Sequence, residues 1–209
     1  MKRTLLCAAS AALLVSTAAF AQSVDRPGHE SPKPGTKSEA MSAVKDTTAG
    51  MVGRVSAHLT NTTEGFITAA ATSDMYEVAA GKIAQERAQS PAVKDFARQM
   101  VEAHTGTTSQ LTSIIAKHGI KVTPPTHVDN RRQGLLDDLR GAKAADFDHR
   151  YISQQVAAHK EADILMRGYA KDGDNAEIRE FAAATGQAVK MHLSMAEKLD
   201  KSQKTASNN

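Results

Sequence analysis

The sequence predicts an all-α fold, a bundle of four long helices, and three observations support this prediction. Apolar residues recur every three or four positions through four long segments, which is the period of an amphipathic helix. Nowhere do apolar and polar residues alternate as they do in a half-buried strand. Short turns separate the first segment from the second and the third from the fourth, whereas a long connection containing prolines joins the two pairs.

The first two long segments predict a helical hairpin over residues 63–118. Ser90-Pro91 should end the first helix and begin the second, because serine caps helices and proline suits the first helical position. Gly119, after a basic last turn, should end the second helix. The expected buried faces are Phe66, Ala70, Ser73, Glu77, Ala80 and Ala84, then Val93, Ala97, Met100, His104, Leu111, Ile114 and Ile115.

The connection contains Pro124-Pro125, which favours an extended chain, followed by a short helix over 131–140 capped by Asp129 or Asn130. A long crossover of this kind is the connectivity of ferritin-like bundles. The predicted domain is therefore a ferritin-like four-helix bundle over residues 63–200, made of two antiparallel hairpins joined by a crossover with a short extra helix.

The third long helix is expected over about 145–170, and the fourth is expected to carry the apolar positions from Ile178 to Leu199, with a tight turn at Asp172-Gly173-Asp174 between them. Asp148 should cap the third helix or interact with its dipole. Residues 201–209 are predicted to be a polar tail. The expected buried faces are Phe147, Tyr151, Ile152, Gln155, His159, Ala162, Leu165, Met166 and Tyr169, then Ile178, Phe181, Thr185, Val189, His192, Met195 and Leu199.

Residues 1–21 are typical of a secretory signal peptide. Lys2 and Arg3 precede a short apolar run, and Ala19-Phe20-Ala21 forms a small-x-small cleavage site. We therefore expect an exported, periplasmic protein, with outer-membrane association left open. The one cysteine, Cys7, lies in this signal, so thiol catalysis is excluded in the mature chain. No later apolar run is long enough to predict a transmembrane helix.

Residues 22–62 are predicted to be a flexible linker, because proline, glycine and polar residues dominate their first part. Within them, residues 38–59 have helical apolar spacing and are interpreted either as a short amphipathic helix or as disordered chain. Such a helix could contact a membrane surface or a partner protein. The formal net charge of +3 falls to +1 without Lys2 and Arg3, which gives no electrostatic case for a nucleic-acid partner. The sequence does not set the oligomeric state.

The strongest functional feature is one polar residue on the apolar face of each long helix: Glu77, His104, His159 and His192. Buried ionisable groups are costly unless they are paired or bind a metal, and glutamate and histidine are common ligands of transition metals. The pattern predicts a site for one transition metal ion, such as Zn, Fe or Cu. A metal-free hydrogen-bond network, in which Glu77 holds one or two histidines, is the alternative.

A comparison of helical positions tests this cluster. Glu77 lies thirteen residues before Ser90 and His104 lies thirteen after Pro91, which places them at one level. His159 lies fourteen residues before Gly173 but His192 lies nineteen after it, a mismatch of about 7 Å at a rise of ~1.5 Å per residue. By this count His192 is the weakest member of the predicted site.

Other chemistry has less support. A di-iron bundle needs Glu-x-x-His motifs, and the sequence contains none, so an iron store or ferroxidase is disfavoured. Serine and threonine residues lack a base at a suggestive spacing, and no catalytic residue is predicted. The sequence favours a metal-binding or stress-related envelope protein. A metal-dependent enzyme and a metal-free structural or interaction module remain the alternatives.

Several stretches together resemble an exported bacterial family, the domain of unknown function four-one-four-two. They are Ser73-Asp74-Met75-Tyr76-Glu77, Ser90 to Ala97, Met100-Val101-Glu102-Ala103-His104, Phe147-Asp148-His149-Arg150-Tyr151, Gln155-Val156-Ala157-Ala158-His159 and His192-Leu193. The resemblance implies a ferritin-like fold, export and no established catalytic activity. Glu77, His104, Asp148, His159 and His192 match the family's characteristic polar positions. Ala103 departs from the acid usual there, and Thr185-Gly186-Gln187 lacks the family's frequent proline.

Overall fold

The computed structural model describes residues 61–206. The predicted signal peptide at 1–21, the predicted helix at 38–59 and all but the last two residues of the predicted linker lie outside this range. Within it the regular secondary structure is entirely helical. The helices are α3 (Thr63–Arg87), α4 (Pro91–Lys117), α5 (Asn130–Gly141), α6 (Ala144–Asp172) and α7 (Ala176–Ala206).

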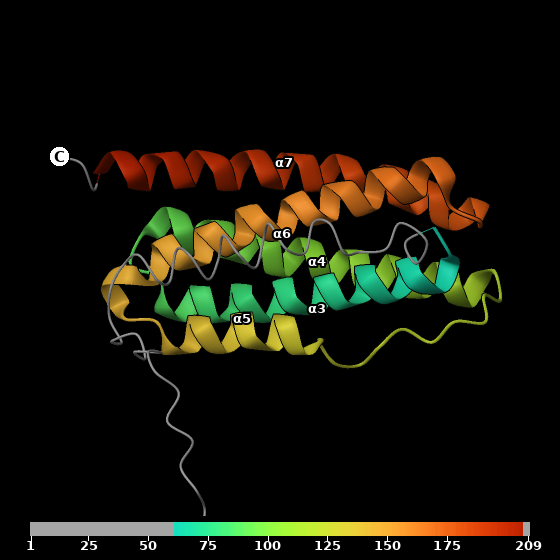
Figure 1. Cartoon of the computed structure of the whole chain (residues 1–209), viewed down its shortest axis with the longest axis horizontal. Helices are drawn as coiled ribbons and strands as arrows, with labels where there is room; N and C mark the ends of the chain where they lie inside the picture. Colours follow the sequence, from blue (N-terminus) through green and yellow to red (C-terminus); the bar gives the residue numbers. More distant parts are fainter. Residues whose placement is uncertain (1–60, 207–209) are drawn as a thin grey trace, which may run out of the picture.

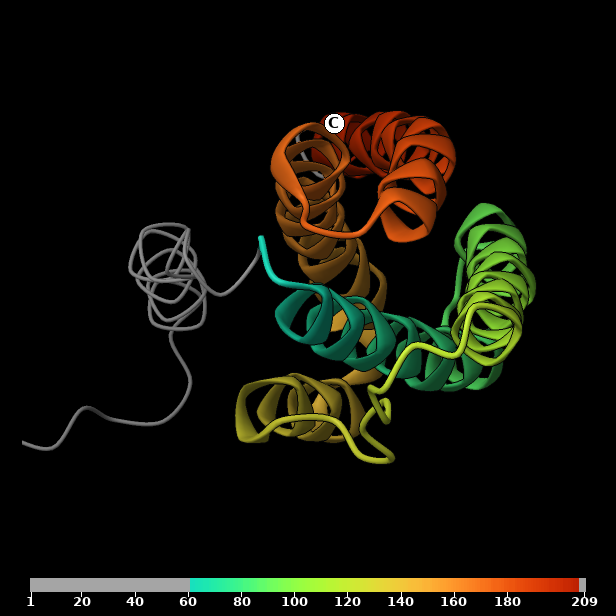
Figure 2. The same ribbon diagram turned by 90° about the vertical axis from the view of Figure 1, so that its right-hand side faces the viewer.

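The helices form two hairpins that share one interior. Helix α3 packs against α4, and α6 packs against α7, each pair joined by a short turn (Figure 1). The hairpins meet through the contacts of α3 with α6 and of α4 with α7, and Figure 2 shows this arrangement end-on. The short helix α5 lies along the outer side of α3, within the crossover that connects α4 to α6.

Side-chain caps set three of the helix starts, and a fourth start is supported from another helix. At the start of α7, Asn175 accepts a hydrogen bond from the Ile178 amide. Thr62 accepts a hydrogen bond from the Gly65 amide, and Asp129 accepts one from the Arg132 amide. Asp148, predicted to act on its own helix, instead accepts hydrogen bonds from the Gln89 and Ser90 amides at the start of α4. The reason is that α6 begins at Ala144, so Asp148 lies past the first four residues, whose amides lack helical partners.

Helix α7 continues beyond the predicted start of the polar tail, as far as Ala206. An ion pair between Asp200 and Lys204, four residues apart on one helix face, supports this last part. Lysine, glutamine and alanine also favour a helix in a segment that has no apolar face.

A polar layer divides the interior into two apolar clusters. One cluster contains Tyr76, Phe96, Met100, Phe147, Tyr151 and Ala196, and the other contains Phe66, Leu111, Met166, Tyr169, Ile178 and Val189. Each long helix contributes to both clusters. The buried residues between them include Asp74, Glu77, His104, Gln155, His159 and His192. Most residues of the buried faces predicted from helical spacing are buried, whereas Ile114, Ile115, Leu165, Met195 and Leu199 are partly buried against the two clusters. The predicted site residues lie where the two clusters meet.

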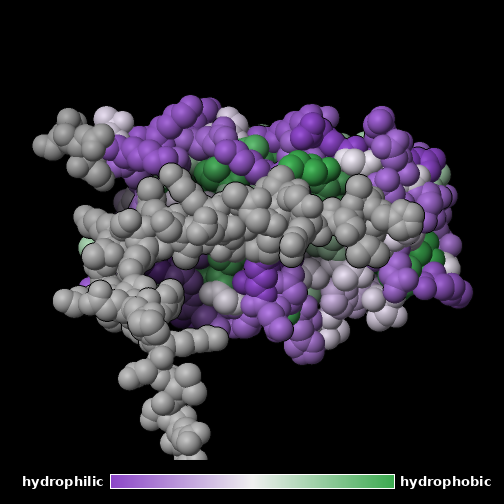
Figure 3. Space-filling view, viewed as in Figure 1, coloured by the Kyte–Doolittle hydropathy of each residue, from purple (hydrophilic) through white to green (hydrophobic). Residues whose placement is uncertain are grey.

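On the part of the face in Figure 3 that is not covered by grey atoms, hydrophilic residues predominate and some hydrophobic residues are visible among them. Among large apolar side chains of the described residues, Ile164 and Met191 are exposed. No helix in the described part of the chain has the length and apolar character needed to cross a membrane.

Candidate metal centre

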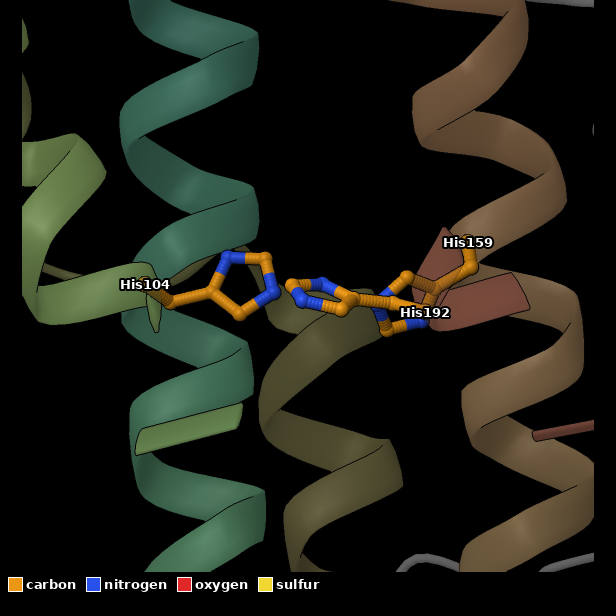
Figure 4. Close-up of side chains that lie close together, drawn as sticks. All are labelled: His104, His159 and His192. Carbon is orange, nitrogen blue, oxygen red and sulfur yellow. The ribbon is translucent and has the colours of Figure 1, made fainter. Parts of the chain in front are cut away.

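Three histidines from three helices converge in the polar layer. His104 of α4, His159 of α6 and His192 of α7 point toward one another (Figure 4). Their ring centroids are 5.6–5.9 Å apart, and one ring nitrogen from each lies within 4.8 Å of the other two. The residues are only 6%, 1% and 7% exposed. This arrangement can hold a metal ion.

His192, the weakest member by residue counting, lies as close to the other two histidines as they lie to each other. The residue count measured the positions of both histidines from Gly173. However, α6 ends at Asp172 and α7 begins only at Ala176, so part of the counted difference lies in the turn. In addition, helical side chains lean toward the N-terminus of their helix. His159 therefore leans away from the turn and His192 leans toward it, which removes the remaining offset.

Asp74 of α3 orients His104. Its Oδ1 lies 2.8 Å from His104 Nδ1, and its Oδ2 accepts hydrogen bonds from the hydroxyls of Thr107 (2.8 Å) and Thr108 (3.1 Å). Because the carboxylate only accepts hydrogen bonds, Nδ1 carries a proton, and in the neutral imidazole Nε2 is left with a free lone pair. A carboxylate behind a histidine is a frequent arrangement at metal sites, where it fixes the ring and increases the basicity of the ligand.

His159 is held in the same tautomer by its own helix. Its Nδ1 donates to the Gln155 carbonyl oxygen at 2.9 Å, which leaves Nε2 without a proton. Among the described residues, three buried imidazole nitrogens have no hydrogen-bond partner: Nε2 of His104, Nε2 of His159 and Nδ1 of His192. Each of these histidines thus brings one unpartnered nitrogen to the interior.

Glu77 lies beside the histidines but outside the group of atoms that lie within 4.8 Å of one another. Its Oε2 accepts a hydrogen bond from Gln155 Nε2 at 2.7 Å, and its Oε1 is 4.0 Å from His159 Nδ1. This nitrogen is already bonded to a carbonyl and is on the opposite side of the ring from the unpartnered Nε2. Glu77 therefore lies behind His159, as Asp74 lies behind His104.

The surroundings separate the proton affinities of the three histidines. Burial, and then the charge of His104, lowers the pKa of His159 to about 4, although its bond to Gln155 opposes the shift. Burial, and then the charges of His159 and His104, lowers the pKa of His192 to about 4. Burial also disfavours protonation of His104, but its hydrogen bond with Asp74 and the charges of Glu77 and Asp74 outweigh burial and raise its pKa. His159 and His192 are therefore neutral at pH 7.

Sequence reasoning missed Asp74, Thr107 and Thr108. Asp74 is three residues before Glu77 and thus on the same face of α3, a spacing that could have identified it. Thr107 and Thr108 follow His104 by three and four residues, which is the same signal on α4. A groove of about 400 Å³ between α3 and α4 is lined by Asp74 and Thr108 among others, so the outer side of this polar group reaches the surface.

The chain belongs to the family described as Domain of unknown function (DUF4142), whose model matches residues 51–199. The match includes α3 to α6 and most of α7, and it contains Asp74, Glu77 and the three histidines. The family resemblance seen in the sequence is thereby confirmed. A search of curated proteins and a search of solved structures each find no match to this chain.

Proposed function

We propose that this protein is an exported, ferritin-like four-helix bundle that binds one transition metal ion through His104, His159 and His192. Two observations carry the proposal: one ring nitrogen of each histidine lies within 4.8 Å of the other two, and each ring has one buried nitrogen without a hydrogen-bond partner in the described part of the chain. Leaving buried polar atoms without a partner is costly. In their neutral tautomers, Nε2 of His104 and Nε2 of His159 are both hydrogen-bond acceptors, so they cannot bond to each other. One cation can instead accept a lone pair from each of the three histidines.

The donor set favours particular metals. Imidazole suits Zn, Cu, Fe and Ni, and the lowered pKa values of His159 and His192 remove proton competition at these two ligands at neutral pH. Export is proposed from the N-terminal signal pattern, and the ferritin-like architecture from the two hairpins and the long crossover. A role in metal handling or stress protection in the cell envelope follows from this combination.

Metal binding by purified protein tests the proposal. We expect about one equivalent of Zn²⁺ or Co²⁺ per metal-stripped chain by equilibrium dialysis and elemental analysis. Replacing any one of the three histidines by glutamine should weaken binding by about 100-fold or more, since changes behind the ligands alone cost 10–100-fold. His127→Gln is the matched control, because it removes an exposed imidazole outside the cluster. Unchanged binding in the three cluster variants, or no binding by the unmodified chain, would refute the site.

A metal-dependent enzyme is the second candidate function, and the ligand count supports it. Catalytic zinc sites use three protein ligands and leave one position open, and the group of close ligand atoms in the described residues contains three histidines. The site is nevertheless deep, since each histidine is less than a tenth exposed. Such an enzyme would take a reactant about the size of water or a diatomic gas. Binding of azide or cyanide to the Co²⁺ form, followed by its visible absorption, would reveal an open position.

A further inference from the structure

Within the described range 61–206, two buried carboxylates next to the histidines form no ion pair with a lysine or an arginine. Asp74 and Glu77, one turn apart on α3, are 7% and 1% exposed. Asp74 accepts hydrogen bonds from His104, Thr107 and Thr108, and Glu77 accepts one from Gln155. Among the described residues, their close ionic contacts are with histidines alone, Asp74 with His104 and Glu77 with His159. Buried negative charge is costly without compensation.

We infer that the site selects a divalent cation, whose two charges balance the carboxylates of Asp74 and Glu77. This inference rests on the proposed metal site and adds the charge of its ion. With a metal bound, the three imidazoles are neutral ligands and contribute no charge. The cation also favours the ionised form of both carboxylates, which contribute two negative charges. A divalent ion brings the buried group to neutrality, whereas a monovalent or trivalent ion leaves one unbalanced charge in a medium of low dielectric constant.

The donor atoms support the same choice independently of charge. Monovalent copper and silver favour soft sulfur ligands, and the group of close ligand atoms consists of imidazole nitrogens alone. Imidazole is a good ligand for divalent zinc, copper, iron and nickel. Neither carboxylate belongs to this group, so Asp74 and Glu77 act on the ion through their charge and through the rings that they contact.

Titration of the metal-stripped full chain with Co²⁺, Zn²⁺ and Ag⁺ tests this inference, because none of these ions changes oxidation state easily. We expect the divalent ions to bind at least about 100-fold more tightly than Ag⁺. Glu77→Gln should lower the affinity for Co²⁺ by about 10–100-fold. Since Coulomb energy is proportional to the charge of the ion, the same variant should lower the affinity for Ag⁺ only by about the square root of that factor.

Glu102→Gln is the matched control, since Glu102 is two residues from His104 but its side chain is 81% exposed. It should change each affinity by less than about twofold, because water screens its charge. If Ag⁺ binds as tightly as Co²⁺, or Glu77→Gln weakens both ions equally, selection by charge is wrong while the metal site stands. If none of the three ions binds, the proposed function itself fails. The comparison of ions in the unmodified chain decides the question even if Glu77→Gln does not fold.

Discussion

At the scale of single residues, the candidate centre depends on which nitrogen of each histidine carries the proton. Asp74 and the Gln155 carbonyl each hold an Nδ1–H, so Nε2 of His104 and of His159 face the interior as acceptors. Thr107 and Thr108 hold the Asp74 carboxylate in place. The arrangement of lone pairs is therefore set before any ion binds.

Asp74→Asn is predicted to lower both the pKa of His104 and the metal affinity. The hydrogen bond with Asp74 and its charge help to raise the pKa of His104, and an uncharged amide removes that charge. The pKa should fall toward the values of the other two histidines, as measured by NMR titration of the metal-free protein. Metal affinity should fall by about 10–100-fold. The exposed control Asp95→Asn should leave both quantities unchanged, and a His104 pKa that does not fall would contradict the role given to Asp74.

At the scale of helices, close packing of α3 on α4 sets the distance between the carboxylates and His104. Gly81 of α3 lies opposite Ala97 and Val101 of α4. A Cβ atom at position 81 would be 2.7 Å from Val101 Cγ2 and 3.0 Å from the Ala97 carbonyl oxygen. The absence of a side chain at Gly81 therefore lets the two helices approach one another, one turn away from Glu77.

Gly81→Ala is predicted to destabilise the fold by about 1–3 kcal/mol, because the added methyl group overpacks this contact. Replacing glycine by alanine within a helix usually increases stability, so the expected effect at Gly81 has the opposite sign. Gly106→Ala on α4 is the matched control, since a Cβ there meets nothing within 4 Å, and it should stabilise by up to about 1 kcal/mol. Urea denaturation of the two variants measures both effects. Equal stabilisation by both substitutions would show that α3 and α4 are not closely packed at Gly81.

Helical periodicity predicted the elements and their buried faces because the period is a local property of the chain. From the sequence alone it identified Glu77, His104, His159 and His192 as buried, and all four are. Periodicity could not show which of the four residues come together as ligands. That depends on their heights along the bundle, which are set by where each turn begins and by the direction in which side chains lean. For the same reason Glu77 was expected among the ligands, whereas its carboxylate lies behind His159. The hydrogen bonds of Asp148 with the start of α4 could not be predicted either, because they join segments that are far apart in the sequence.

At the scale of the whole molecule, a polar layer across the middle of an apolar interior ties stability to pH and to bound cations. The layer lies between two apolar clusters to which all four long helices contribute, so disturbance there affects both hairpins. A cation that binds only the folded state adds stability in proportion to the logarithm of its concentration over its dissociation constant. The apo form lacks this contribution and keeps three unpartnered nitrogens.

The metal-free protein is predicted to lose stability as the pH falls from about 6.5 to about 4. His159 and His192 have folded-state pKa values of about 4, below the ordinary value of about 6.5. In this range the unfolded chain binds more protons at these two sites, so the free energy of unfolding rises with pH. The raised pKa values of His104 and Glu77 act in the opposite direction. The double variant His159→Gln/His192→Gln isolates the effect of these two histidines. It removes the two groups with lowered pKa values and keeps His104 and Glu77, whose pKa values are raised.

Urea denaturation in a chelator at several pH values between 7.5 and 4 measures this dependence. The free energy of unfolding of the double variant should depend less steeply on pH than that of the unmodified chain, or should fall as the pH rises, since His104 and Glu77 remain. A saturating divalent ion should steepen the slope of the unmodified chain, because protons then compete with the ion for the same nitrogens. It should leave the variant unchanged. Identical slopes for the variant and the unmodified chain in the absence of metal would mean that His159 and His192 are not buried as neutral imidazoles. The lone pairs assigned to the centre would then be unavailable to a metal.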